Sequence, residues 1–564
     1  TTTTSHARQF RDIPPSPDGK RIAFTALGRV YVADYPAGTP QRLTDQDIGE
    51  HSPVWAPDGS AIAFATWSDA AGGHLMRAPV VRGGRARAVR LSDVPGSYDE
   101  LVWAPNGRIV AVQRATRDLQ DLGASSFLGA SGASNLIWVP ATGGAVALIA
   151  PSAGRSRPHF AGDAERIYAY SRTDGLVSFR WDGTDQRSHL KVTAPTGPAG
   201  AAPDFEMMLR MAGNPSSDLP QLGLHPDPTE TGAPAPPAGL VIMAPSGDQA
   251  LAYVGMDLYL VTVPQVGGTT PTVSLNSPDN AAVPVKRIND IGGQFPTWNR
   301  DGTAVFWSIG NAALRYDLAR ARAVDDSLKL AARQTAADTA ARADSTRRQA
   351  AARAGYRPDE HRILGAIRRD TPRGVAVLRG GRAVTMKGRE IIDNADIVVR
   401  DNRIIAIGPR GQVNIPAGAR EIDVSGKTVI PGFVDIHYHP QWLVPNVHTN
   451  QVWQYLATLA YGTTTTRDPQ TAVTDVLTYQ DRAETGEMIG PRIYHTGPGV
   501  FSGERIRDLD HARNVLRRYS DYYGVTTLKM YGAGNRQQRQ WIIMAAKELG
   551  IMPTTEGSLD IRLN

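Results

Sequence analysis

The sequence predicts a protein of several domains: an all-β propeller, a small β domain and a partial parallel α/β barrel. Three features predict this order. The first half repeats a short hairpin unit, the middle contains an alanine-rich stretch without Gly or Pro, and the last part alternates strands with helices. The length of 564 residues also exceeds what one hydrophobic core usually supports.

The repeated unit consists of an apolar stretch, a Pro-Asp-Gly-like turn and a strand in which apolar and polar residues alternate. Asp-Gly and Asn-Gly provide the left-handed backbone that a tight hairpin needs, and a period of two is typical of half-buried strands. Copies recur roughly every 40–60 residues, apart from one larger gap, and this spacing is the size of a four-stranded propeller blade. They lie at 16–34, 52–67, 101–114, 157–172, 241–264 and 295–317.

As a set, these repeats resemble the TolB-like family of six-bladed β-propellers, and we predict such a domain of about six blades over residues 1–317. The Pro- and Gly-rich stretch at 198–240 is expected to be a long loop between blades. A β-sandwich with several Asp-Gly turns is the alternative. A propeller followed by a serine peptidase is disfavoured, because no Gly-x-Ser-x-Gly motif is present.

Residues 318–372 are expected to form a helical linker, since the stretch up to Ala354 is dominated by alanine and charged residues. A coiled-coil seam is the alternative, although large apolar residues at helical spacing are missing. Residues 373–432 contain short alternating strands separated by Gly-rich turns, which predicts a small β domain. That domain is expected to lead into one buried strand over 429–436.

From residue 433 to 564 strands and helices alternate, which indicates a parallel βα series of the (β/α)₈ type. Helices are expected at 450–462, 471–488, 508–524 and 536–550. Strands are expected at 463–469, 491–498, 525–532 and 551–557. In this fold the carboxyl ends of the strands carry the reactive groups.

Two histidines stand at the carboxyl end of the first strand, in the segment "VIPGFVDIHYHP". Side chains alternate along a strand, so His437 and His439 should face the same side, together with Asp435. Two neutral imidazoles on one rigid strand can converge on a single metal ion. The alternative is a pair of polar residues in a surface loop.

The small β unit, this segment and the following βα repeats resemble the amidohydrolase superfamily, particularly its imidazolonepropionase- and prolidase-like branch. The resemblance implies a metal-dependent hydrolase in which His437 and His439 bind the cation. It also implies that the lysine of the fourth strand, Lys529, is carbamylated and bridges two metals. Zn²⁺ is the divalent cation expected.

Two departures from the family pattern affect this expectation. Thr554 stands where the fifth strand usually ends in a histidine, and Glu556, two residues later, is the candidate substitute as ligand and catalytic group. The alternatives are a strand-end carboxylate in solvent for Glu556 and a side chain reaching for solvent for Lys529. The resemblance further implies later strands with a histidine and an aspartate, so we expect this chain to be a fragment.

Three other residues near strand ends are candidates for smaller roles. His495 ends the third strand and is expected either to touch substrate or to be structural. His448 is expected in a loop over the site, and Asp468 is expected to cap the second strand. The substrate class is a small-molecule or peptide-like compound with an amide or related bond.

Composition excludes several other classes of protein. Without cysteine there is no disulfide, thiolate metal site or Cys nucleophile, and a dispersed net charge of +6 disfavours nucleic-acid binding. No apolar run is long enough to predict a membrane span. We expect a periplasmic or secreted protein that is able to form homo-oligomers. The predicted function is a metal-dependent amidohydrolase whose propeller gates or binds substrate; a non-catalytic scaffold with a degenerate hydrolase half is the alternative.

Overall fold

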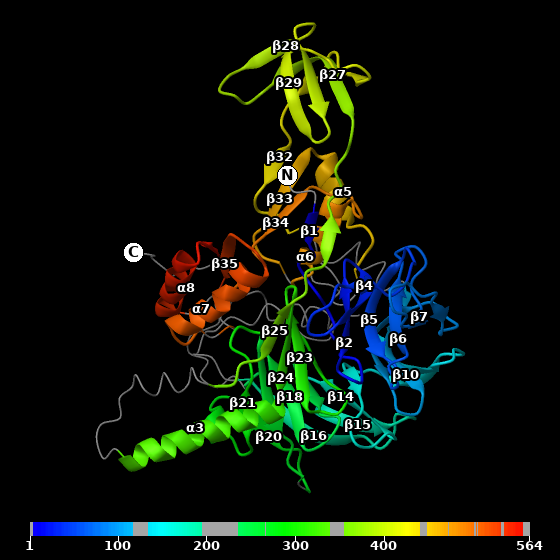
Figure 1. Ribbon diagram of the computed structural model, residues 1–564, viewed down its shortest axis with the longest axis vertical. Coiled ribbons are helices and arrows are strands. Elements are labelled where there is room, and N and C mark those ends of the chain that lie inside the picture. The colour runs from blue at the N-terminus through cyan, green and yellow to red at the C-terminus, as the bar shows by residue number, and fades with distance from the viewer. Residues whose placement is uncertain are drawn as a thin grey trace.

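The computed structural model describes residues 4–116, 133–194, 235–265, 267–338, 355–439, 448–471, 473–500, 504, 506–531 and 535–556. Figure 1 shows a propeller of β-sheets, a separate small β domain at the far end of the long axis, and βα elements between and beside them. The expected loop at 198–240 falls mostly outside the described residues. No described helix has the length and apolar character needed to cross a membrane.

The first half forms six small sheets, as expected for propeller blades, and they are antiparallel except for the parallel pair β16 and β20. Apart from the short β1 (Thr4–His6), the strands of the first three blades are β2 (Arg21–Ala26), β3 (Arg29–Asp34), β4 (Gln41–Arg42), β5 (Gly49–Trp55), β6 (Ala61–Trp67), β7 (Leu75–Pro79), β8 (Val89–Arg90), β9 (Ser97–Trp103), β10 (Arg108–Arg114), β11 (Ser134–Pro140) and β12 (Ala147–Pro151). The next three contain β13 (Ser156–His159), β14 (Arg166–Ser171), β15 (Gly175–Arg180), β16 (Arg187–Thr193), β17 (Leu240–Met243), β18 (Gln249–Val254), β19 (Asp257–Thr262), β20 (Thr272–Ser274), β21 (Val285–Arg287), β22 (Gln294–Trp298), β23 (Ala304–Ile309) and β24 (Ala312–Asp317).

The repeated turn connects the first two strands of a blade. Gly59 and Gly107 have φ values of +72° and +81°, which explains why glycine follows Asp or Asn there. The side chain of Asp58 accepts a hydrogen bond from the backbone N–H of Ser60 at 2.9 Å, which closes the turn. Apolar side chains between neighbouring blades form the core, with Trp67 and Trp307 among the largest fully buried side chains.

The first strands of several blades contain a bulge at one residue with positive φ. Ser52, Glu100, Arg157 and Phe295 all have φ near +52°, and the strand register shifts beside Ser52, Arg157 and Phe295. A bulge of this kind bends a strand and redirects its side chains.

The sixth blade is completed by residues from beyond the alanine-rich stretch. α3 (Leu318–Asp338) follows β24, but β25 (Asp359–Arg362) pairs with β24 as the fourth strand of that blade. β26 (Ala366–Arg368) pairs with β1. Of the predicted linker 318–372, the first part is helical and the last part belongs to the β-structure, because the outer edge of β24 offers unpaired backbone groups.

The small β domain is a five-stranded sheet in the order β29-β28-β27-β30, with β31 also paired to β27. Its strands are β27 (Val375–Val384), β28 (Ile391–Arg400), β29 (Arg403–Pro409), β30 (Arg420–Asp423) and β31 (Thr428–Val429). The parallel elements follow as β32 (Phe433–Asp435), α5 (Trp453–Ala460), β33 (Thr463–Asp468), α6 (Val476–Thr485), β34 (Arg492–His495), α7 (Leu509–Arg517), the π-helix η3 (Arg518–Tyr522), β35 (Thr527–Tyr531), α8 (Arg536–Glu548) and β36 (Met552–Glu556).

The five expected parallel strands are present, but the described residues do not form a closed barrel. β32, β33 and β34 form one sheet, and β35 and β36 form another. The two sheets are joined by a bridge between Val500 and Met530, and Arg467 on β33 donates to Thr527 Oγ1 on β35 at 3.1 and 3.2 Å.

The prediction of one buried strand over 429–436 is wrong. The strand is divided into β31 and β32 at Pro431 and Gly432, since Pro431 has no N–H to donate. Gly432 lies so close to Thr464 that an added Cβ would be 2.2 Å from its Oγ1. Phe433 and Val434 are about 60% exposed, because β32 pairs only with β33 among the described residues.

Candidate functional site

His437 and His439 lie directly after β32, at the carboxyl end of the parallel sheet. Their ring centroids are 5.6 Å apart and the ring planes are inclined by 85°. The side chain of Asp435 accepts a hydrogen bond from the backbone N–H of His437 at 3.0 Å, which fixes the turn where the strand ends. The two rings are therefore neighbours.

Asp468, at the end of β33, fixes one of these rings. Its Oδ1 lies 2.7 Å from His439 Nδ1, and the same oxygen accepts from the backbone N–H of Gln470 at 2.9 Å. The Asp468 side chain is 3% exposed and that of His439 is 27% exposed. A proton on Nδ1 that is donated to this carboxylate makes Nε2 the unprotonated nitrogen of His439.

The distance between the rings is compatible with a shared cation. Two imidazoles that bind one tetrahedral Zn²⁺ at ordinary Zn–N distances have ring centroids about 5 Å apart. The observed 5.6 Å is close to that value. A carboxylate behind the second ring is the usual partner of a metal-binding histidine. The residues present thus fit two ligands of such a site, with one oriented by Asp468.

A third ligand is not assembled in the part of the chain that the structure describes. No group of three or more His, Asp or Glu side chains among those residues is arranged to hold a metal ion. Lys529 is 3% exposed. It lies on β35, which belongs to the second parallel sheet and not to the sheet that precedes the two histidines. Glu556 ends β36, where its backbone pairs with Tyr531; its side chain lies outside the described residues.

His495 is enclosed beside α6, and both of its ring nitrogens have partners. Nδ1 accepts from the backbone N–H of Gly497 at 3.1 Å, so Nε2 carries the proton and donates to Gln480 Oε1 at 3.1 Å. Burial, assisted by the charge of Arg8, lowers the pKa of His495 to about 3. This ring is held neutral by the fold, which favours the structural interpretation over substrate contact.

His448 is also buried, between α6 and the propeller. Its Nε2 is 3.5 Å from Asp475 Oδ1, and its ring meets Tyr479 edge to face. Burial and the charges of Arg11 and Arg482 hold the pKa of His448 well below its usual range. Neither ring nitrogen has a hydrogen-bond partner among the described residues, which is uncommon for a residue that is 6% exposed.

Asp468 was predicted only as a strand cap, and its partnership with His439 was missed. The register could have indicated it: β32 and β33 run parallel with Asp435 opposite Thr466, so Asp468 lies level with the residues that follow β32. The rule that strand carboxyl ends meet at one edge then places Asp468 beside the histidines.

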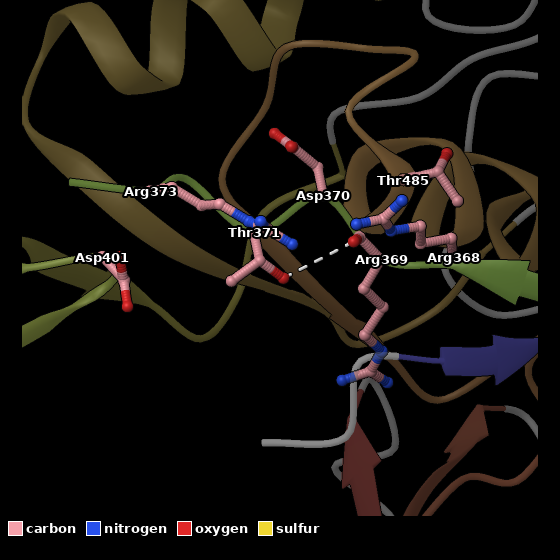
Figure 2. A pocket seen from close by; sticks show the side chains of 7 residues that line it. All are labelled: Arg368, Arg369, Asp370, Thr371, Arg373, Asp401 and Thr485. Carbon is pink, nitrogen blue, oxygen red and sulfur yellow. Dashed lines mark hydrogen bonds between the residues drawn. The ribbon is translucent and has the colours of Figure 1, made fainter.

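The described residues also line a cavity of about 550 Å³, shown in Figure 2. It lies where the chain passes from β26 to β27, and its lining consists of Arg368, Arg369, Asp370, Thr371, Arg373, Asp401 and Thr485. Arg369 is already paired with Glu484 at 2.9 Å. Since this cavity contains no imidazole and no buried carboxylate, we do not assign it to the reaction.

The neutral state of His495 makes a testable contribution to stability. Its folded pKa of about 3 lies below the ordinary 6.5, so the unfolded chain takes up the proton first as the pH falls. As the pH falls from 7 to 5, this protonation lowers the free energy of unfolding by about 2 kcal/mol. His495→Asn should make the loss of stability over this range smaller by that amount, measured by urea unfolding at pH 7, 6 and 5. Parallel curves for both proteins would contradict this assignment.

Comparison with known proteins gives only short similarities. No family model matches the chain. Over 64 residues it is 41% identical to 5-methylthioadenosine/S-adenosylhomocysteine deaminase of Symbiobacterium thermophilum, 11% of this chain and 15% of that protein. It is 40% identical over 71 residues to imidazolonepropionase of the same organism, 12% and 17%, and 35% identical over 63 residues to adenine deaminase of Paracoccus denitrificans, 11% and 11%.

Among solved structures, a putative prolidase from Bifidobacterium longum matches with a TM-score of 0.27 and 24% identity, over 32% of this chain and 49% of that one. A putative TolB from Agrobacterium tumefaciens matches with 0.30 and 14%, over 50% and 91%. The matched segments of the three curated relatives span less than a fifth of their own lengths. The predicted similarity to imidazolonepropionase is thus confirmed over a short segment.

Proposed function

We propose that this chain carries part of a metal-dependent hydrolase that acts on a C–N bond of an amide or related compound. The observation that carries the proposal is the pair of neighbouring rings of His437 and His439, with Asp468 behind the second ring. The names of the short curated matches support the same class of reaction, since they include two deaminases and an allantoinase.

In this proposal His437 and His439 bind the cation, and Lys529 and Glu556 are its further ligands. Zn²⁺ or a similar divalent ion supplies a Lewis acid that activates water near neutral pH. Asp468 would keep the Nδ1 proton of His439 in place, so that Nε2 would be the nitrogen that holds the ion. The propeller restricts entry or binds substrate beside the site.

The proposal is tested by metal content and by product release together. The purified chain is dialysed against Zn²⁺, its metal is measured by emission spectrometry, and release of ammonia or amine is followed with dipeptides, N-acyl amino acids and cyclic amides. We expect about one equivalent of bound Zn²⁺ or more. A folded chain that retains no metal would favour a scaffold with a degenerate hydrolase half.

Asp468→Asn is expected to weaken Zn²⁺ binding by about 10- to 100-fold, the usual effect of removing the carboxylate behind a metal-binding histidine. The amide is nearly the same size and still accepts the hydrogen bond from Gln470, so the fold should persist. Competition with a chromogenic chelator measures the affinity. Unchanged affinity would show that the negative charge of Asp468 beside His439 does not serve metal binding.

A further inference from the structure

Charged and aromatic groups from both halves of the chain meet in a buried cluster at the start of α6. Arg11 from the propeller forms an ion pair with Asp475, and His51 and His448 lie beside them. These four residues are 3%, 1%, 4% and 6% exposed, respectively. Because a single charge is costly in such surroundings, Arg11 and Asp475 depend on each other.

The residue before Asp475 is held by two blades. Thr474 Oγ1 accepts from Gln9 Nε2 at 2.6 Å and from Gln294 Nε2 at 3.0 Å. Arg11 itself lies 4.6 Å above the ring of Phe295. The first and sixth blades therefore hold the beginning of α6 against the propeller.

Thr474 and Asp475 end the connection between β33 and α6, and this connection begins at the candidate site. It starts with Asp468, which binds His439, and continues through Gln470 and Thr471, which are 8% and 1% exposed. The backbone N–H of Thr471 donates to Gly497 O at 3.1 Å, which ties the connection to the chain after β34. Because packed interiors transmit strain, we expect a displacement at Asp475 to reach Asp468 through the described residues of this connection.

We propose that Arg11 is a positioning residue for the metal pair: by holding Asp475, it fixes the connection from which Asp468 orients His439. The propeller is then a structural part of the site as well as a neighbouring domain. This inference rests on the proposed function, because it concerns the geometry of the same cation.

The test compares Arg11→Gln, Asp475→Asn and the double variant with the unchanged chain. Zn²⁺ affinity is measured by chelator competition, and coordination by the visible spectrum of the Co²⁺-substituted protein, at a temperature where each variant is fully folded. We expect each single variant to bind Zn²⁺ about tenfold more weakly, with an altered Co²⁺ spectrum. The double variant should recover most of the affinity, since it leaves no unpaired charge.

Two controls make the outcomes distinct. Arg29→Gln removes a propeller arginine whose partner, Asp47, is 99% exposed, and should change nothing at the metal. If Arg11→Gln does not fold, Arg11→Lys replaces it in the comparison, because lysine keeps a positive charge at this position. Arg11→Lys should bind Zn²⁺ more tightly than Asp475→Asn. Singles that bind Zn²⁺ with unchanged affinity and spectrum, although less stable, would overturn the positioning role alone. An unchanged chain that binds no metal would overturn the proposed function, and this inference with it.

Discussion

Replacing both His437 and His439 by alanine should reduce bound Zn²⁺ from about one equivalent to about zero while the chain stays folded. The two rings are the proposed metal ligands, and their centroids lie 5.6 Å apart. His437 is exposed and His439 is partly exposed, so the replacements leave no cavity in a packed core. Any Zn²⁺-dependent release of amine or ammonia should disappear with the metal.

Emission spectrometry after dialysis measures this loss, and circular dichroism checks that the variant is folded. His6→Ala is a matched control, because His6 is an exposed histidine on β1. If the double variant bound as much Zn²⁺ as the unchanged chain, the cation would have other ligands and the proposed site would be wrong.

Replacing Arg8 by methionine is expected to destabilise the contact between the propeller and α6 by about 3 kcal/mol at pH 8. Arg8 pairs with Asp481, whose side chain is 1% exposed, and donates to Glu484 Oε1 at 2.9 Å. Its backbone N–H also donates to Asp481 Oδ2 at 2.7 Å. Without the guanidinium, the Asp481 carboxylate is left buried with no cation beside it.

The same variant should be less destabilised at pH 5. Burial raises the pKa of Asp481 to about 6, even though Arg8 acts to lower it. Because the folded pKa lies above the unfolded value of about 3.9, the contribution of Asp481 to the stability of the protein falls as the pH rises through 6. Removing Arg8 raises the folded pKa further, so protonation at pH 5 relieves more of the cost.

Calorimetric or urea unfolding at pH 8 and pH 5 measures both quantities. Arg29→Met serves as control, since its pair with exposed Asp47 should contribute at most about 1 kcal/mol at either pH. An equal loss of stability for Arg8→Met at both pH values would show that Asp481 is not the group that Arg8 stabilises.

The histidine pair illustrates how far local pattern reaches. An i, i+2 spacing at a strand end was enough to predict that two rings lie on one side, because alternation is a property of the strand itself. The partner on the neighbouring strand could not be read in this way. Whether Asp468 caps its own strand or orients His439 depends on the register between β32 and β33.

The last strand of the sixth blade also could not be predicted from the local sequence. Asp-Gly turns located the hairpins, but nothing local distinguishes β25 from a linker, since its sequence Asp-Glu-His-Arg has little strand character. β25 forms because the edge of β24 requires hydrogen bonds. The buried strand expected at 429–436 was wrong for a related reason: burial depends on a second neighbour, which a sequence run cannot reveal.

The sequence by itself determined the repeat of the blades, the alternation of helices with parallel strands, and the pair of candidate ligands, because each follows from the period and turn chemistry of a few consecutive residues. Only the tertiary structure decided that Arg8 and Arg11 of the propeller bind α6, and that Asp468 supports His439. These contacts join residues far apart along the chain, and their energies depend on burial and register that exist only after the chain has folded.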